Sequence, residues 1–306
     1  MDPALAAAVS AAEACGIPST ALVRQSAGST SAVFAAGDLV FIVAGAYADP
    51  ATLTARVAIA AVLSRSGRFV RPVWPEPRSY ADRLVTAWER VHLRPGPIDW
   101  HSAGLAVRTL HDTPPGALPV PLPNVGDLAD VRVAVDLATA SGRLDPGGAR
   151  LLRGVATRLD EELAHLDDRR VVVHGDLHAP NVLGGWSGVL LCDTDEIAFG
   201  APGYDLGVLL DPGRPAIPFA GLTPFVQGYG APLPSVAARR TYARSAHLRR
   251  TVALLSHPAT TVHARFYRRV RLGAWAAMAR DWERDLVPVV ALPPGTRVRL
   301  ARRAGR

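Results

Sequence analysis

Short apolar runs dominate the first third of the chain, and each has the length of a strand. These runs lie at residues 32–34, 39–43, 70–73 and 84–88, and the prolines at 72, 75 and 77 make the third an edge or irregular strand. Gly37-Asp38 separates the first two runs and predicts a turn between antiparallel strands. Helices are predicted at residues 2–15 and 49–67, because each opens with an Asp-Pro pair that suits an N-cap and a first turn and closes near a glycine.

Helical periodicity takes over after a polar, Pro- and Gly-punctuated linker at residues 89–97. The predicted helical regions are 101–112, 126–140, 145–168, 203–211 and 235–286. Two further apolar runs, at 171–173 and 188–192, predict short strands among these helices. The pattern predicts an α+β fold with a small strand-rich lobe, residues 1–90, and a larger helical lobe, residues 91–306.

Composition adds few constraints. Of the 306 residues, 49% are hydrophobic, and the net charge of +7 comes from 34 basic residues that are all arginine. Binding of nucleic acid through residues 239–250 and 265–271 is one interpretation, and a compositional bias of the coding sequence is the other. The arginines are dispersed and accompany no nucleic-acid motif, so we favour the second.

The N-terminal segment and the two cysteines predict a cytoplasmic chain. Asp2 stands where a secretory signal has positive charge, and Glu13 interrupts the apolar stretch. Cys15 and Cys192 lie far apart and follow no metal-ligand spacing, so we expect free thiols. No uncharged apolar stretch of about 18 residues occurs, so no membrane partner is expected.

The densest polar chemistry follows the predicted strand at 171–173. The segment HGDLHAPN, residues 174–181, holds a carboxylate, two imidazoles and a carboxamide, and the next predicted strand leads to Asp193. Two strand ends therefore present Asp176, Asn181 and Asp193. Phosphate transfer uses such a set, since hard oxygen ligands hold Mg²⁺ on the phosphates and a carboxylate orients the attacking hydroxyl.

Together, HGDLHAPN and the later segment LLCDTDEIAFGAPGYDLG resemble the aminoglycoside phosphotransferase and choline kinase group of small-molecule kinases. The resemblance implies a two-lobed, protein-kinase-like fold. It also implies transfer of the γ-phosphate of ATP or GTP to a hydroxyl of a small molecule, with an antibiotic among the candidates. By resemblance, the catalytic residues are Asp176 as base and His174 as a residue that fixes the loop. Asn181 and Asp193 are then the Mg²⁺ ligands, and Asp205 braces the loop and caps the next helix.

The predicted small lobe departs from this family at the nucleotide site. The family has a Gly-rich loop and a third-strand Lys that pairs with a helix Glu, whereas Ile42 and Val57 take those two places here. Backbone N–H groups and hydroxyls of a Ser-rich loop could still bind phosphate, although an ordinary turn is the alternative. The candidate residues are Gly28, Ser29, Thr30 and Ser31. Since the chain lacks lysine, Arg24 and Arg56 are the candidate phosphate-binding cations, unless they are solvated surface residues.

Two interpretations follow from the missing ion pair. The chain is either a working kinase with an altered nucleotide site or a kinase-like binding protein with a degraded one. The complete set of Asp176, Asn181 and Asp193 favours the first, because a protein without catalysis has no chemical need for a base and two metal ligands.

The linker should offer backbone groups to the purine, and the acceptor should bind in the helical lobe near Asp176. The purine-binding candidates are Trp88, Glu89 and Arg90. Aromatic candidates for the acceptor site, with core packing as the alternative, are Tyr229, Tyr267, Trp275 and Trp282. Acidic residues that could attract a cationic acceptor are Asp195, Glu196, Asp281, Glu283 and Asp285, and the first two could instead take a second metal.

Overall fold

The structure is a computed structural model, and it divides into two compact units, each assembled from separated stretches of chain. It describes residues 2–27, 31–46, 48–166, 169–210, 217–256 and 262–281. Unit 1 comprises Met1–Pro123, Ala179–Ile197 and Ala220–Ala231. Unit 2 comprises Asn124–His178, Ala198–Phe219 and Pro232–Arg306. The predicted boundary between the two lobes, residues 1–90 and 91–306, stays a prediction.

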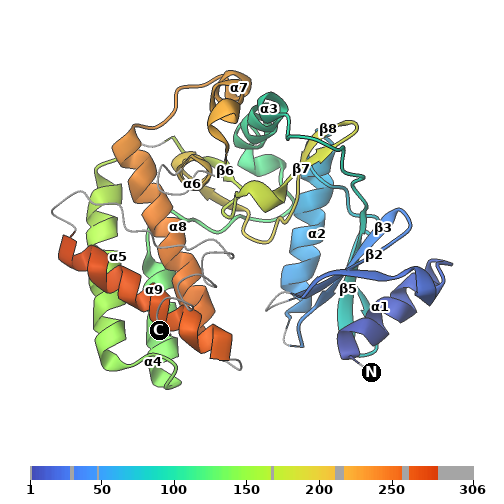
Figure 1. The fold of residues 1–306 in the computed structure, drawn as a ribbon, viewed down its shortest axis with the longest axis horizontal. Helices are drawn as coiled ribbons and strands as arrows, with labels where there is room; N and C mark the ends of the chain where they lie inside the picture. The colour runs from blue at the N-terminus through green and yellow to red at the C-terminus, as the bar shows by residue number, and fades with distance from the viewer. Residues whose placement is uncertain are drawn as a thin grey trace, which may run out of the picture. The chain divides into compact units, whose positions relative to one another are not determined.

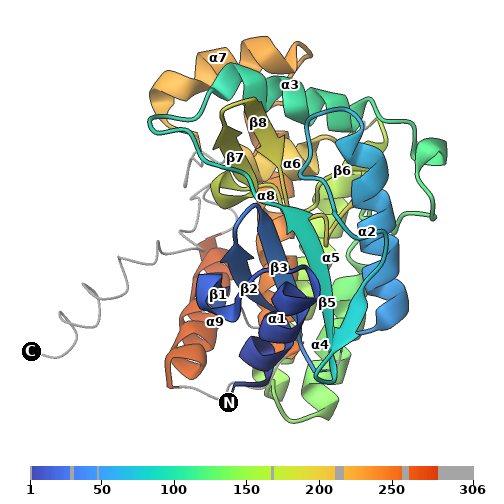
Figure 2. The ribbon, with the colours of Figure 1, turned by 90° about the vertical axis from the view of Figure 1, so that its right-hand side faces the viewer.

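A five-stranded antiparallel sheet with helix α1 (Pro3–Ala14) on one face forms the largest part of unit 1 (Figures 1 and 2). In sheet order the strands are β1 (Val23–Ala27), β2 (Ser31–Ala36), β3 (Leu39–Ala44), β5 (Arg83–Glu89) and β4 (Arg78–Tyr80). Phe34 stands opposite Phe41, and Phe41 opposite Ala87, so these buried side chains share one face. They pack with the buried alanines of α1, which follow the helical period, and form the core of this unit.

Residues 70–73, predicted as an edge or irregular strand, pair only irregularly with the edge of β5, and the predicted helix that follows Asp49 is confirmed. Pro72 makes only an isolated bridge to Trp88, because proline has no N–H with which to continue a ladder. Helix α2 (Pro50–Ser64) begins after Asp49, whose carboxylate accepts the Thr52 N–H at 2.9 Å. The cap side chain thus replaces a missing intrahelical partner and fixes the start of the helix.

Helices α3 (Trp100–His111) and α7 (Phe219–Tyr229) meet through glycines in unit 1. A Cβ added at Gly104 would lie 2.2 Å from the Phe225 carbonyl oxygen, and one at Gly228 would lie 2.0 Å from the His101 carbonyl oxygen. The two backbones therefore approach more closely than any side chain would permit. Tyr229, predicted either to wall the acceptor site or to pack, is a buried contact of this pair.

Gly104→Ala is expected to destabilise the protein by about 1–3 kcal/mol, the usual cost of overpacking, because backbone and not a flexible side chain blocks the new methyl group. The matched control is Gly154→Ala, on the exposed face of another helix, where nothing lies within 4 Å of the added Cβ. That change should stabilise by about 0.5–1 kcal/mol. Thermal melting measures both, and equal shifts would contradict the close approach of α3 and α7.

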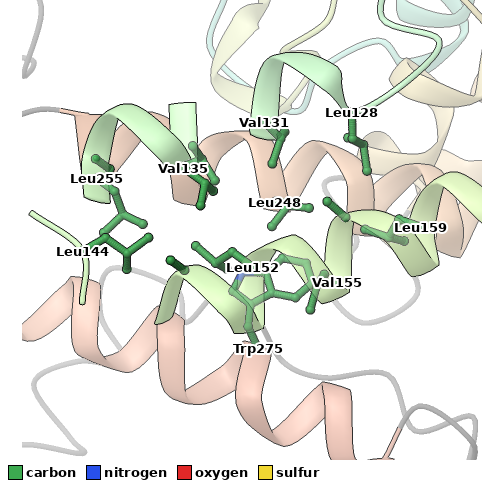
Figure 3. Close-up of a cluster of buried hydrophobic side chains, with 14 of the residues drawn as sticks. Leu128, Val131, Val135, Leu144, Leu152, Val155, Leu159, Leu248, Leu255 and Trp275 are labelled. Atoms are coloured by element: carbon green, nitrogen blue, oxygen red, sulfur yellow. The ribbon is translucent and has the colours of Figure 1, made fainter. Parts of the chain in front are cut away.

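Four helices surround the core of unit 2 (Figure 1), and their apolar side chains point to a common centre (Figure 3). They are α4 (Ala129–Ala140), α5 (Pro146–Ala164), α8 (Val236–Ser256) and α9 (Val262–Asp281). Trp275 is fully buried there, and its Nε1–H donates to Thr251 Oγ1 at 3.0 Å. Trp275 is therefore a core residue and not part of an acceptor wall. The Tyr267 side chain and residues 282–306, which include Trp282, Glu283 and Asp285, lie outside the described parts, as does the side chain of Asp281.

Two small antiparallel ladders carry the predicted polar segments. In unit 2, β6 (Val171–Val173) pairs with β9 (Ala198–Gly200), and in unit 1, β7 (Val182–Gly185) pairs with β8 (Gly188–Leu191). Strands β6 and β8 are the two apolar runs predicted from the sequence, and each leads into its polar segment as expected. Among the helices that the structure describes, none combines the length and the hydropathy needed to cross a bilayer.

Candidate active site

A buried carboxylate holds the loop that follows β6. Asp205 has no exposed surface, and its two oxygens accept the N–H groups of His174, at 2.8 Å, and Gly175, at 3.0 Å. Gly175 has φ +79°, a conformation that glycine adopts without steric cost. Hydrogen bonds to a charged acceptor are the stronger ones, so they fix the backbone directly before Asp176.

This arrangement agrees with the bracing role expected of Asp205, but the expected helix cap is absent. Asp205 lies inside the first turn of α6 (Gly203–Leu209), whose N-cap residue, Pro202, makes no side-chain cap. A carboxylate in a first turn still interacts favourably with the helix dipole. His174 is also fully buried, and its expected role in fixing the loop stays a prediction.

Asp176 faces two basic side chains of its own unit. Its Oδ2 lies 3.3 Å from His178 Nε2, and its Oδ1 accepts a hydrogen bond from Arg250 Nη2 of α8. The Asp176 side chain is 26% exposed, so a solute can reach it. Burial by itself would raise the pKa of Asp176, but the hydrogen bond to His178 and the charge of Arg250 outweigh burial and lower the pKa overall. Asp176 is therefore ionised at neutral pH, the state that a general base requires.

Sequence reasoning missed Arg250, which lies 74 residues from Asp176 along the chain. It belongs to the arginine-rich stretch 239–250 that the nucleic-acid interpretation used. Two other arginines of this stretch pair with carboxylates of unit 2: Arg249 with Asp130 at 3.0 Å, and Arg244 with Glu162 at 3.8 Å. These arginines face protein carboxylates, which weakens the case for a nucleic-acid surface.

Asn181 and Asp193 lie at the same end of the β7–β8 hairpin in unit 1. Val182 stands opposite Leu191, and beyond this pair the Cys192 N–H donates to the Asn181 carbonyl at 3.1 Å. Asn181 is buried, whereas Asp193 is exposed and has φ +65°. A left-handed residue other than glycine is uncommon, and such residues concentrate at functional sites. An amide and a carboxylate thus flank one hairpin end and could hold a divalent cation.

Neither cysteine forms a disulfide, as expected from their spacing. Burial raises the pKa of the Cys192 thiol to about 12, and the charge of neighbouring Asp193 acts in the same direction. Cys192 is therefore a neutral thiol at physiological pH, which suits a structural residue beside Asp193.

One of the two candidate phosphate-binding cations points to this hairpin end. Arg56 of α2 pairs with Asp195 at 3.0 Å, and the Asp195 N–H lies 3.4 Å from an Asp193 carboxylate oxygen. Arg24 instead pairs with Asp2 at 2.8 Å, and both side chains are exposed. Val57, at the place where the family has a Glu, is buried and carries no charge. Arg56 is thus the cation that unit 1 places beside its polar segment.

The linker residues proposed to bind the purine already use their N–H groups. The Glu89 N–H donates to the Arg71 carbonyl at 3.0 Å, and the Arg90 N–H donates to the Asp38 carbonyl at 2.8 Å. The Trp88 indole donates to Thr86 Oγ1 at 2.8 Å. The next N–H, that of Val91, has no hydrogen-bond partner among the residues described, so it is a better candidate donor to a purine.

Most of the predicted phosphate-binding loop lies outside the residues that the structure describes. Gly28, Ser29 and Thr30 are not among the described residues. Ser31 begins β2 and stands opposite Ala44 in the sheet. The role of this loop stays a prediction.

Solved structures of small-molecule kinases share the fold. A choline/ethanolamine kinase family protein from Mesorhizobium loti is 20% identical, with a TM-score of 0.60 over 84% of this chain and 87% of that one. An aminoglycoside phosphotransferase, APH(3'')-Id from Streptomyces rimosus, is 21% identical, with a TM-score of 0.58 over 78% and 95%. The amicoumacin kinase hAmiN is 14% identical, with a TM-score of 0.63 over 90% and 91%. Among curated protein sequences, none matches this chain.

These findings confirm the predicted fold class, an α+β protein-kinase-like fold with a strand-rich sheet and a helical region. A sequence profile described as the phosphotransferase enzyme family matches residues 50–248, more than half of the chain. The match begins with α2, includes the loop of Asp176 and the hairpin that leads to Asp193, and ends within α8. The prediction of a small-molecule kinase is thereby confirmed, and the chain belongs to the phosphotransferase enzyme family.

Proposed function

We propose that this kinase transfers the γ-phosphate of ATP or GTP to a hydroxyl of a small molecule in the cytoplasm, with Asp176 as the base and Asn181 and Asp193 as Mg²⁺ ligands. The observation that carries the proposal is the loop itself. Asp205 fixes its backbone, and the loop then presents Asp176 as an ionised, partly exposed carboxylate. Phosphate transfer asks the protein mainly to position groups and to stabilise charge, and a rigid loop serves the first need.

In the proposed step, the acceptor hydroxyl gives its proton to the Asp176 carboxylate while its oxygen forms a new bond to the γ-phosphorus. The bond between the γ-phosphorus and the bridging oxygen breaks, and its electron pair leaves with the nucleoside diphosphate. Asp176 orients the hydroxyl and receives the proton, and Asp205 keeps the loop in place for it.

The donor set of Asn181 and Asp193 fits Mg²⁺, which prefers hard oxygen ligands. In proteins this ion usually binds through one or two carboxylates together with substrate phosphates and water. Across the described stretches of the chain, no group of three or more His, Cys, Asp and Glu side chains forms a closed metal cage. A two-residue site completed by nucleotide is therefore the better-supported arrangement, and the bound ion would neutralise charge on the phosphates.

Arg56 is the proposed substitute for the phosphate-binding lysine of the family. It is the arginine of α2 that reaches the segment of Asp193 and Asp195, whereas the strand position, Ile42, holds no charge. Among solved structures of this fold, one phosphotransferase is in complex with ADP and spectinomycin, and another with GDP and kanamycin. Relatives therefore hold either purine nucleotide, which supports ATP or GTP as the phosphate donor here.

Asp193→Asn is expected to weaken binding of the metal–nucleotide complex about tenfold to hundredfold, the equivalent of one charged interaction of about 1.5–3 kcal/mol. Asn tolerates the left-handed backbone at this position, so the fold should survive. The control is Asp82→Asn, because Asp82 is also left-handed and exposed but lies in the β4–β5 turn. Calorimetric titration with ATP or GTP and Mg²⁺ measures both variants.

Unchanged nucleotide affinity in Asp193→Asn would remove Asp193 from the metal site. The contrary result is a wild-type protein that binds nucleotide and yet neither phosphorylates a hydroxyl compound nor hydrolyses the nucleotide. That result would identify it as a kinase-like binding protein and not as an enzyme. Turnover of nucleotide that depends on Mg²⁺ supports the proposed enzyme.

A further inference from the structure

Arg250 places a positive charge on the proposed base, and both partners remain accessible. Within unit 2, the Arg250 guanidinium contacts Oδ1 of Asp176, and its side chain is 29% exposed. His178 lies against the other oxygen of the carboxylate. Both oxygens of Asp176 thus face a basic group, and the acceptor hydroxyl must reach one of them for proton transfer.

Folding does not explain this contact well. Arg249 and Arg244, on the same helix, pair with Asp130 and Glu162, which lie outside the loop of Asp176. An ion pair that is mostly buried adds little net stability, because the desolvation of the two charges offsets their attraction. The neighbouring positive charge also weakens Asp176 as a base, because it stabilises the carboxylate that has to take up the proton. An arginine at this place is therefore a disadvantage for transfer to a neutral or cationic acceptor.

We propose that the acceptor is an anionic hydroxyl compound, and that its carboxylate or phosphate group pairs with Arg250 and takes the guanidinium from Asp176. This inference rests on the proposed function and specifies its substrate class. The planar guanidinium fork matches the geometry of carboxylate and phosphate groups. A cationic acceptor would instead place a like charge beside Arg250. Arg250 is in this account a residue that determines specificity and positions the substrate.

The contact also sets the chemistry of the acceptor. Arg250 and Asp176 touch, so the anionic group and the reactive hydroxyl must be near neighbours in the substrate. When the anion engages Arg250, Oδ1 of Asp176 becomes available to the hydroxyl while Oδ2 stays beside His178. Compounds with a hydroxyl a few bonds from a carboxylate or a phosphate ester fit this requirement.

Matched compounds that differ only in charge test the inference. One set is glycerate, glycerol and 3-aminopropane-1,2-diol, and a second is gluconate, sorbitol and glucamine, with choline and kanamycin as further cations. Each is offered with ATP or GTP and Mg²⁺ above the usual KM range of about 1 µM to 1 mM, and phosphorylated product is measured by mass spectrometry. Product from the anionic members is expected. A neutral or cationic compound as the better acceptor, or no product from any anion while nucleotide is hydrolysed, overturns the inference.

Arg250→Gln separates this role from a structural one. It should raise KM for the anionic acceptor about tenfold to hundredfold, the value of one lost charge-assisted hydrogen bond. The preference for the anionic member of each set over its neutral counterpart should fall in parallel, a change that a purely structural loss would not cause. Arg250→Lys keeps the charge and should lie between wild type and Arg250→Gln, and it replaces the Gln variant if that one does not fold. The control is Arg153→Gln, whose arginine pairs with Asp136 on the surface of the same unit.

An unchanged KM in Arg250→Gln overturns the inference and leaves the proposed function intact. If wild-type protein neither binds nor hydrolyses nucleotide, the proposed function fails, and the inference fails with it. The two failures are therefore distinguishable by nucleotide use alone.

Discussion

Asp176→Asn is expected to slow phosphate transfer by about 10²- to 10⁴-fold, the usual contribution of a positioned general base, and to leave nucleotide affinity within a few-fold of wild type. The amide has the size of the carboxylate and still accepts hydrogen bonds, so the contacts with Arg250 and His178 can persist. It cannot take up the hydroxyl proton. Steady-state rates with an accepted substrate and calorimetric titration of nucleotide measure the two effects separately.

The control for this variant is Asp136→Asn, since Asp136 is also paired with an arginine of unit 2 but is exposed on the surface. Its rate should match wild type. Turnover of Asp176→Asn within a few-fold of wild type would show that another group is the base. Loss of nucleotide binding together with turnover would assign Asp176 to the metal–nucleotide site instead.

Asp205→Ala is expected to destabilise the protein by about 3–6 kcal/mol, because two hydrogen bonds to a charged acceptor, each worth about 1.5–3 kcal/mol, are lost in a buried place. This is a large part of the roughly 5–15 kcal/mol that stabilises an ordinary protein. Activity should also be lost at temperatures where the variant is still folded, because the loop before Asp176 loses its support. Denaturant unfolding and initial rates at low temperature measure these two effects.

Asp145→Ala is the matched control. Asp145 also accepts a backbone N–H, that of Gly148 at 2.9 Å, but it caps α5 on the surface and supports no part of the site. Its loss should destabilise the protein much less than the loss of Asp205, as for an exposed N-cap, without an effect on rate. If Asp205→Ala and Asp145→Ala behave alike, the buried brace is not what holds the catalytic loop.

Local sequence signals predicted much of the fold because they act within a few residues. Asp2, Asp49 and Asp145 each stand before a proline, and each caps the helix expected there. The Gly37-Asp38 turn lies between two paired strands, β2 and β3, as the alternation of apolar runs predicted.

Elements that depend on tertiary contacts were not predictable in the same way. Helix α7 contains Pro224 and two glycines, which lower its intrinsic helix propensity, and its packing against α3 through Gly104 and Gly228 offsets this. Strands β7, with the sequence VLGG, and β9, with the sequence AFG, lack the apolar run that marked β6 and β8, and β9 is instead defined by its pairing with β6.

The residues of the candidate site also differ in how far the sequence predicts them. The spacing of Asp176, Asn181 and Asp193 is local to one segment and could be recognised in the sequence. The contact of Arg250 with Asp176 spans 74 residues, and arginines of similar appearance surround it on α8, so no local pattern marked it. The occupied N–H groups of Glu89 and Arg90 likewise follow from pairing with distant segments.

The most direct test of the proposed metal site is the anomalous signal of Mn²⁺ in crystals grown with a non-hydrolysable ATP or GTP analogue. The account predicts a peak about 2.0–2.2 Å from the Asn181 amide oxygen and from an Asp193 carboxylate oxygen, with the γ-phosphate on the side of Asp176. A peak held by other residues, or nucleotide bound with its phosphates away from these three side chains, would contradict it.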